Sequence, residues 1–547
     1  MAKQKENIIR FDGGHGLAVL AIFGVLIVLF WTAPLGGEFS WSDAPRHALN
    51  GVFIKDLVVA MPLKDLEGFA YGYYAKYPAL TILFYPPLFY FLSAPFYGLL
   101  GASYETALFV VFLHYVMLGL GCYRLGLYWF RPSLSLALAL TLLVVPEIAF
   151  WGRQIMLEVP AFAFLVWSAV AFMQYLRGQV SRYLYLTALL LLLAIYTKLS
   201  VAFLGMTYVA VLLLERGPGI FKDRNILICG ALTFLGLIPL MVMTFKFGRA
   251  NLQSVINISD SMVSRATLGG WLWYARQLPN QLGWALLTCV IASFAYAIWR
   301  RSTPALARRD RLFWGLWFLS GYIFFSAIDL KEARHSIFIL LPMVFIVFLV
   351  LARYLTIRWA VLLGFGLFAV TFAQTLASRP VLFVQGYAEA VDKVAKLAPK
   401  GSVVLFSGNR DGSFIFNLRV RDDRRDLSVM RADKMLLRVA VRRELGVEQK
   451  TLNEAEIGAM INRQGVDYVV MEPGFWTDLE AMRRFERVMQ SPQFELVERV
   501  PIHANFPVPE NELLIYRNRG PVSRNVVSIP IELPIIGRVI QSGVERQ

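Results

Sequence analysis

Long apolar runs separated by short charged loops dominate the first 380 residues of the chain. A bilayer core is crossed by about 20 apolar residues of helix, and shorter runs imply long polar side chains at their ends or local thinning. The pattern predicts eleven membrane-spanning helices, near residues 17–34, 107–129, 133–150, 159–176, 183–197, 200–214, 226–244, 281–299, 311–328, 335–352 and 359–377.

A twelfth apolar run, residues 79–100, does not fit a straight span. It contains Pro86, Pro87 and Pro95, and proline breaks or kinks a helix interior. Counted as a span, it would put Arg124 and Arg131 outside and reverse the polarity of every later loop. Taken as a re-entrant or interfacial segment, it leaves the arginine- and lysine-rich loops inside, as positive-inside orientation requires. The sequence therefore predicts a cytoplasmic amino terminus and an outer, periplasmic or extracellular, carboxy-terminal region.

From about Pro380 the pattern changes to that of a soluble α/β domain. Short apolar runs predict strands and 3.6-residue spacing predicts helices. We expect strands at 403–406 and 468–471, helices at 387–397 and 435–444, and an antiparallel hairpin from 494–500 and 512–516. No glycine-rich phosphate loop follows these strands, so the domain is given no catalytic role. The predicted fold is thus a polytopic α-helical membrane domain (1–379) followed by a soluble outer α/β domain with a tail (380–547).

Composition supports a membrane protein and excludes an ordinary soluble enzyme. Of 547 residues, 57% are hydrophobic and 17% charged, against about 45–50% and 25% in soluble domains. The net charge is +16, of which +14 lies in residues 1–380, where loop charges set orientation. Nucleic acid is therefore not an expected partner. The three cysteines form no disulfide framework, CxxC pair or zinc spacing.

The predicted topology gathers a few ionisable residues at the outer ends of apolar helices. They lie in the outer loop 36–78, in the outer loop 245–280 and at the outer helix ends, and the candidates are Asp43, Arg46, Lys76, Arg153, Glu158, Lys198, Lys331, Arg334 and His335. Such cations are ordinarily membrane-interface anchors, which is the alternative for each one. Lys198 stands out because it interrupts about thirty otherwise apolar residues.

This mixture of two carboxylates and several cations suits sugar transfer from a lipid phosphate. Asp43 is the candidate base for an acceptor hydroxyl. A departing phosphate needs positive charge, which Arg46, Lys76, Lys198 and Arg334 could supply. Glu158 could hold sugar hydroxyls or, with Asp43, a divalent metal ion, and His335 is a further ligand if it faces inward.

The same residues resemble motifs of the GT-C superfamily, in particular the bacterial aminoarabinose transferase and protein O-mannosyltransferase group (family 39/83-like). Five elements occur in order: the loop from Asp43 to Ala48, Lys76-Tyr77-Pro78 with Tyr85-Pro86-Pro87-Leu88, Arg153 to Pro160, Tyr196-Thr197-Lys198, and Lys331 to His335. The sequence departs from the family pattern at three points. Ala44 replaces the usual Glu, Glu158 replaces an Asp, and Lys76 is separated from the Pro-Pro pair.

The resemblance implies an inverting glycosyltransferase that uses a polyprenyl-phosphate sugar, such as an undecaprenyl-linked one, in a bacterial inner membrane. It implies Asp43 as catalytic base, with Glu158 beside it, and phosphate contacts from Arg46, Lys76, Lys198 and Arg334. Arg153, Lys331 and His335 are expected neighbours. The departures leave a metal site and the sugar open. The acceptor, as in lipopolysaccharide or other glycan modification, could be a lipid, a glycan or a protein.

Three other functions are compatible with the pattern. A lipid-linked saccharide flippase or other transporter would place ionisable residues near mid-membrane and often has paired repeats, neither of which the sequence contains. A polysaccharide ligase or polymerase would use the same kind of donor. A scaffold would act through its outer domain alone.

Overall fold

The computed structural model describes residues 13–33, 38–247, 263–299, 306–439, 443, 446–523, 529–533 and 538–542. Residues 36–37 and 248–262 of the two predicted outer loops, and much of the tail beyond residue 523, lie outside the described residues. The chain divides into two compact units. The first comprises residues 1–33, 111–239 and 262–381, and the second comprises residues 34–110, 240–261 and 382–547.

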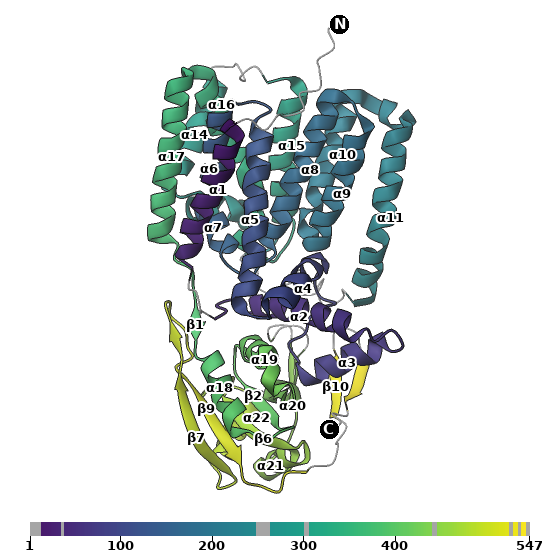
Figure 1. The fold of residues 1–547 in the computed structure, drawn as a ribbon, viewed down its shortest axis with the longest axis vertical. Helices are drawn as coiled ribbons and strands as arrows, with labels where there is room; N and C mark the ends of the chain where they lie inside the picture. Colours follow the sequence, from purple (N-terminus) through teal and green to yellow (C-terminus); the bar gives the residue numbers. More distant parts are fainter. Residues whose placement is uncertain are drawn as a thin grey trace. The chain divides into compact units, whose positions relative to one another are not determined.

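The first unit is entirely helical where the structure describes it (Figure 1). Two of its helices, α5 and α11, continue into the second unit. The helices are α1 (Gly13–Trp31), α5 (Tyr104–Gly126), α6 (Pro132–Leu143), α7 (Pro146–Gly152), α8 (Glu158–Gly178), α9 (Ser181–Thr197), η1 (Leu199–Ala202), α10 (Phe203–Arg216), η2 (Gly217–Lys222), α11 (Arg224–Phe247), α13 (Leu268–Leu282), α14 (Trp284–Trp299), α15 (Arg308–Ser326), η4 (Ala333–Ile339), α16 (Leu340–Tyr354) and α17 (Ile357–Ser378).

Each of the eleven apolar runs forms a helix or a pair of helices, but the count of eleven spans is not confirmed. Among the described residues, six helices are long and apolar enough to cross a membrane. A seventh span results if α6 and α7 are counted together, although they are bent by 67°. The bend lies where Pro146 occupies the first turn of α7, since proline starts a helix well but cannot continue one.

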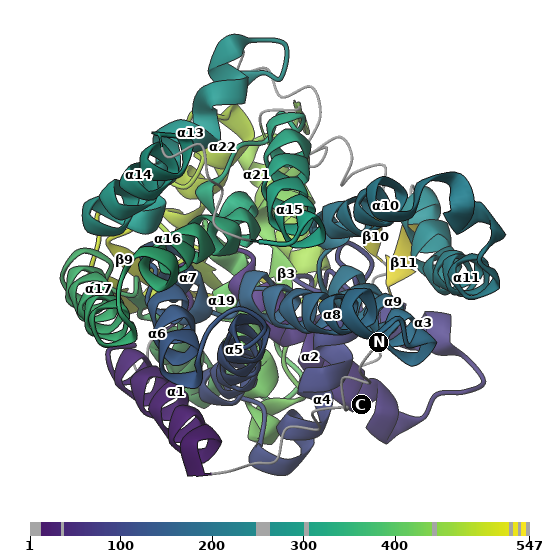
Figure 2. The same cartoon turned by 90° about the horizontal axis from the view of Figure 1, so that it is seen from above.

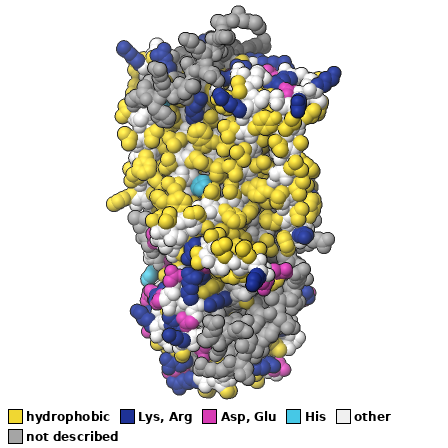
Figure 3. Space-filling view, turned by 45° about the vertical axis from the view of Figure 1, so that its right-hand side comes forward, with side chains coloured by type: hydrophobic (Ala, Val, Ile, Leu, Met, Phe, Trp, Pro, Cys, Tyr) yellow, Lys and Arg dark blue, Asp and Glu magenta, His cyan; other side chains and the backbone are white. Residues whose placement is uncertain are grey.

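The apolar helices of the first unit differ in how much of their surface other helices cover. In the apolar window of α8, 83% of residues are buried, against 11% in α11 and 22% in α17. Figure 2, seen along the helices, shows α8 among its neighbours and α17 and α11 on opposite sides of the bundle. Hydrophobic side chains cover the helical surface in Figure 3. Exposed apolar helix faces of this kind belong in lipid, so the chain is a multi-pass membrane protein.

Positive residues of three loops meet at one end of this helical unit. Arg177, near the end of α8, lies 3.6 Å from Asp310 at the start of α15. Arg308 donates to the Leu214 carbonyl of α10 at 3.1 Å. Glu158 begins α8 and Lys198 follows α9, so these two lie at the opposite end of their helices. The Arg300 and Arg301 pair of the same predicted inner side lies outside the described residues.

The second unit contains a mixed five-stranded sheet in the order β3-β2-β6-β9-β7. Strand β2 pairs in parallel with β3 and β6, and β9 pairs antiparallel with β6 and β7. Its elements are α2 (Ala44–Ala60), α3 (Leu66–Lys76), α4 (Leu88–Leu100), β1 (Val384–Gln385), α18 (Tyr387–Leu397), β2 (Val403–Ser407), α19 (Asp411–Val420), η5 (Asp422–Arg424), β3 (Ser428–Arg431), α20 (Ala432–Leu436), β4 (Leu437–Val439), β5 (Val447–Gln449), α21 (Glu454–Arg463), β6 (Val466–Met471), α22 (Glu480–Met489), β7 (Phe494–Pro501), β8 (His503–Ala504), β9 (Glu512–Asn518), β10 (Ile529–Leu533) and β11 (Arg538–Ser542).

Most sequence predictions for the α/β part are confirmed. Helix α18 has the predicted bounds, both predicted strands are present, and β7 and β9 form the expected antiparallel pair. The helix predicted at 435–444 is wrong: α20 ends at Leu436, and β4 pairs with β5 instead. In β4, Leu437 and Val439 are buried while Arg438 between them is exposed, which is the two-residue period of a strand.

The predicted outer loop and dipping segment are more structured than the sequence indicated. Residues 36–78 include two helices, α2 and α3. Residues 79–87 form turns, and α4 follows with Pro95 inside it. Within the second unit α4 packs on α2, where a side chain at Gly51 would overlap the Tyr97 ring at 2.7 Å, so glycine permits this close approach.

Candidate functional site

The nine predicted site residues are divided between the two compact units. Those in the first unit are Glu158, Lys198, Arg334, Arg153, Lys331 and His335, and those in the second are Asp43, Arg46 and Lys76. Within each unit the structure brings some of them together and gives others a different partner.

Glu158, Lys198 and Arg334 form one cluster in the first unit. Glu158 is fully buried at the start of α8, and its Oε1 lies 2.9 Å from Lys198 Nζ and 3.7 Å from Arg334 Nε. Lys198 reaches it because the chain leaves α9 there in an extended conformation before η1 begins. Burying a carboxylate costs free energy unless cations lie beside it, so the three charges stabilise one another.

The second carboxylate oxygen of Glu158 differs from the first in its contacts. Oε2 is buried and has no hydrogen-bond partner among the residues that the structure describes. Buried carboxylate oxygens usually accept hydrogen bonds. A hydroxyl of a bound sugar is one donor that could fill this position.

Arg334 also interacts with residues beyond Glu158. Its Nε lies 2.5 Å from Glu332 Oε2, and its guanidinium lies over the Trp151 ring, 5.3 Å from the ring centroid. His335 Nε2 is 3.9 Å from the same Glu332 oxygen. The Glu332 side chain is 27% exposed and that of Arg334 is 9% exposed. Because water screens the exposed carboxylate, the ion pair between Glu332 and Arg334 is weakened. A phosphate could therefore compete with Glu332 for Arg334.

Lys331 lies beside this cluster in sequence but contacts another element. Its Nζ donates to the carbonyl oxygens of Phe325, Ser326 and Ile328 at the end of α15. A cation at a helix carboxy terminus satisfies exposed carbonyls and complements the helix dipole. Burial lowers the pKa of Lys331 to about 8. Its place in the structure is that of a helix cap.

Arg153 is buried and holds three helix ends together. Only 1% of the residue is exposed. Its guanidinium donates to the carbonyls of Ala149 and Arg379 and to the hydroxyl of Thr32, at 2.7–2.8 Å. These partners follow α1, lie in α7 and follow α17. Because each of its guanidinium nitrogens donates to a protein oxygen, Arg153 stabilises the packing of these three helix ends.

In the second unit, Asp43 directly precedes α2, and Arg46 lies in the first turn of that helix. Arg46 Nη2 donates to both carboxylate oxygens of Asp411 at 2.9 and 3.0 Å, and Nη1 donates to the Ser42 carbonyl at 2.6 Å. Arg431 approaches Asp411 from the other side at 2.7 Å. Burial alone would raise the pKa of Asp411, but Arg431 and Arg46 lower it. The residues around Asp411 thus fix the start of the Asp43 helix.

Lys76 ends α3, where its Nζ donates to the Arg425 carbonyl. Burial lowers the pKa of Lys76. Nearby, sequence reasoning missed a buried ion pair between Asp56 of α2 and Arg419 of α19, with Tyr73 donating to the same carboxylate. No signal in the sequence links residues 363 positions apart.

Among the described residues, the Glu158 cluster does not fit a metal ion. Within the described parts of the chain, no group of three or more His, Cys, Asp and Glu side chains could hold one. Glu158, the buried carboxylate proposed as a ligand, has Lys198 and Arg334 beside it, and these cations would repel another positive ion.

Comparisons with known proteins show a resemblance to membrane glycosyltransferases, in part of the sequence and in the fold. Residues 85–243 match the model of the dolichyl-phosphate-mannose-protein mannosyltransferase family. No curated protein matches the chain by sequence. The family model therefore confirms the resemblance expected from the short motifs.

Two solved structures show the likeness over most of the chain. ArnT from Cupriavidus metallidurans bound to undecaprenyl phosphate has 12% sequence identity and a TM-score of 0.59, covering 94% of this chain and 100% of ArnT. The archaeal oligosaccharyltransferase AglB from Archaeoglobus fulgidus, in complex with an inhibitory peptide and a dolichol-phosphate, has 12% identity and a TM-score of 0.50, covering 84% of this chain and 69% of AglB. At these identities the likeness is one of fold.

Proposed function

We propose that this protein is an integral membrane glycosyltransferase that transfers a sugar from a polyprenyl-phosphate donor to an acceptor hydroxyl, with inversion at the anomeric carbon. The observation that carries the proposal is the buried Glu158 with Lys198 and Arg334 at one end of apolar helices. The family model and the polyprenyl-phosphate complexes of structures with this fold support it.

In the proposed reaction, the Asp43 carboxylate accepts the proton of the acceptor hydroxyl as its oxygen attacks the anomeric carbon. The bond between that carbon and the phosphate oxygen breaks, and the phosphate leaves with its electron pair. Lys198 and Arg334 stabilise the developing negative charge without reorganising, because Glu158 already holds them in place. Glu158 Oε2 orients the sugar through a hydroxyl. Arg46 and Lys76 remain predicted phosphate contacts.

The proposed orientation puts the loops at Arg177, Arg216 and Arg308 in the cytoplasm, following the positive-inside rule. The Glu158 end of α8 and the domain from residue 380 then lie on the outer face. Cysteine labelling from each side of sealed vesicles, at single sites introduced into these loops, would test the assignment.

The decisive experiment replaces Asp43 with asparagine, which keeps the shape and removes the base. We expect Asp43→Asn to abolish transfer from a radiolabelled polyprenyl-phosphate sugar in reconstituted vesicles, with donor binding unchanged. Asp392→Asn, at an exposed position of α18, is the matched control and should transfer normally. Full transfer by Asp43→Asn would overturn the assigned base. Movement of the donor across the vesicle membrane without any transfer would favour a flippase instead.

A further inference from the structure

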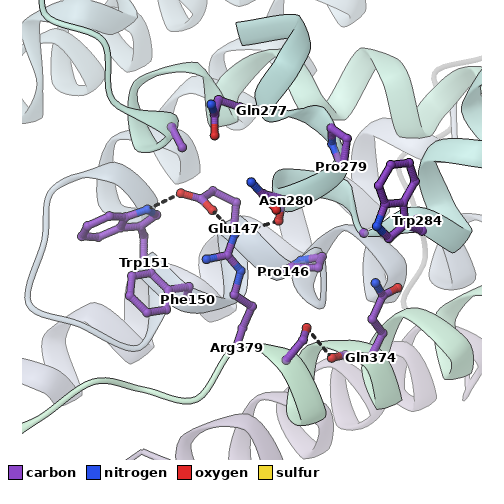
Figure 4. A pocket seen from close by; sticks show the side chains of 13 residues that line it. Pro146, Glu147, Phe150, Trp151, Gln277, Pro279, Asn280, Trp284, Gln374 and Arg379 are labelled. Atoms are coloured by element: carbon purple, nitrogen blue, oxygen red, sulfur yellow. Dashed lines mark hydrogen bonds and ion pairs between the residues drawn. The ribbon is translucent and has the colours of Figure 1, made fainter. Parts of the chain in front are cut away.

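A cavity outside the Glu158 cluster lies among α7, α13, α14 and α17 of the first unit, with a volume of about 540 Å³ (Figure 4). We propose that it is a binding subsite for an uncharged saccharide. The proposal deepens the proposed function and rests on it for the origin of that saccharide, which is either the transferred sugar or the end of an acceptor glycan.

The charge of the cavity favours a neutral ligand. Of the described residues that line it, Glu147 and Arg379 alone are ionisable, and they neutralise each other at 3.2 Å. Glu147 is 3% exposed and also accepts a hydrogen bond from Trp151 Nε1 at 2.8 Å. Arg379 donates as well to the Asn280 carbonyl at 2.9 Å. The one cation among the described lining residues is therefore already balanced by a buried carboxylate, so the cavity has no net positive charge to attract a phosphate or carboxylate ligand.

The polar side chains of the lining match hydroxyl groups. Gln277 and Asn280 of α13 and Gln374 of α17 contribute amides, as Figure 4 shows. Each amide both donates and accepts, and each sugar hydroxyl also does both. The three amides therefore offer both donors and acceptors to the hydroxyls of a sugar.

The backbone makes room for one of these amides. Gly283 has a φ of +76°, a conformation that favours glycine, and a side-chain carbon there would lie 2.6 Å from Gln374 Oε1. Glycine at this position thus lets α17 bring its amide close to the turn between α13 and α14. A larger residue there would force the amide to shift.

Aromatic rings complete the site. Trp151, Phe150 and Trp284 line it, and Trp284 is 68% exposed at the start of α14. The apolar C–H faces of a sugar ring pack on aromatic rings while its hydroxyls reach polar groups at the edge, the usual division in ligand pockets of about 300–1,000 Å³. The volume is enough for a short saccharide.

Trp151 connects the cavity with the candidate cations. Its Nε1 binds Glu147, while its ring lies under the Arg334 guanidinium. Ala333, which lines the cavity, directly precedes Arg334. A saccharide in the cavity would therefore lie next to the group proposed to hold the donor phosphate.

Saturation-transfer NMR tests the site directly. The protein is reconstituted in lipid nanodiscs, since maltoside detergents carry a competing sugar, and probed with methyl α-glucoside, methyl α-mannoside, maltose and, as a charged comparison, glucuronic acid. We expect transfer to at least one neutral probe and about three- to tenfold weaker binding in Gln374→Leu, as for loss of one hydrogen bond. Thr371→Val, one turn earlier on α17 with its hydroxyl bonded to its own helix, is the matched control.

Three outcomes would overturn the subsite: no saturation of any neutral probe, equal binding by Gln374→Leu, or preference for glucuronic acid. Steady-state transfer by Gln374→Leu then separates the sources. A raised KM for the donor alone identifies the transferred sugar, and a raised KM for the acceptor alone identifies the acceptor glycan. If wild-type protein binds neutral saccharides but transfers no sugar, the proposed function fails and the subsite stands.

Discussion

The Glu158–Lys198 pair allows the contribution of charge to stability to be separated from its contribution to activity. Lys198→Met removes the cation 2.9 Å from a fully buried carboxylate and leaves only Arg334, at 3.7 Å. Breaking a buried pair costs about 3–5 kcal/mol, and the remaining arginine and the 19% exposure of Lys198 reduce this to about 2–3 kcal/mol. In Glu158→Gln/Lys198→Met both charges are gone, so we expect stability within about 1 kcal/mol of wild type.

The measurement is SDS-induced unfolding in mixed micelles, run beside transfer activity for wild type, both single variants and the double variant. Activity should be lost in all three variants, because the phosphate loses its cation or the sugar its carboxylate. Lys198→Arg, which keeps the charge, should retain stability. The reasoning is refuted if Lys198→Met unfolds at the wild-type SDS fraction, or if the double variant is less stable than either single one.

Three further predictions follow from the described contacts. Arg153→Met leaves three buried oxygen atoms without their donor and should destabilise the protein by about 3 kcal/mol or more in the same unfolding assay, whereas a neutral result would show that water replaces the guanidinium. Asp411→Asn weakens the hold on Arg46, a predicted phosphate contact, and should lower kcat/KM for the donor, which unchanged kinetics would contradict. Burial raises the pKa of Glu38 to about 7 despite hydrogen bonds from the start of α18, so the folded state binds its proton more tightly than the unfolded state does. The stability that this group contributes is therefore fully present below pH 4.5 and is lost, by about 3 kcal/mol, as the pH rises through 7. Glu38→Gln should remove this part of the pH dependence of stability, as measured by melting curves from pH 4 to 8.

Local pattern predicted the helical part of the fold well. Each of the eleven runs predicted as spans became helical, and the predicted hairpin formed, because hydrophobic period and proline position act within a few residues. The span count was not confirmed, since helices such as α9, with 17 residues, are apolar but shorter than the helices that count as spans by length. Which helices cross a membrane depends on how each one packs, and composition alone does not give this.

The candidate site was predictable in part for the same reason. Glu158, Lys198 and Arg334 meet because each lies at a helix end on one side of a bundle, which the order of spans already indicated. The partners of Arg46 and Lys76 could not be predicted, because Asp411 and Arg425 lie about 350 residues further along the chain. The helices inside residues 36–78 were missed because part of their packing, such as that of α2 on α19, involves this distant segment.

The long separation between these partners also orders events during synthesis. Arg46 and Asp56 leave the ribosome 365 and 363 residues before Asp411 and Arg419. At about 5–20 residues per second, the early segment waits roughly 20–70 s for its partners. Through that interval its charged groups remain hydrated and α2 lacks the surface that later buries it. The contacts that fix the start of the Asp43 helix are therefore among the last to form, and a truncated chain that ends before Asp411 would lack them even with its membrane helices inserted.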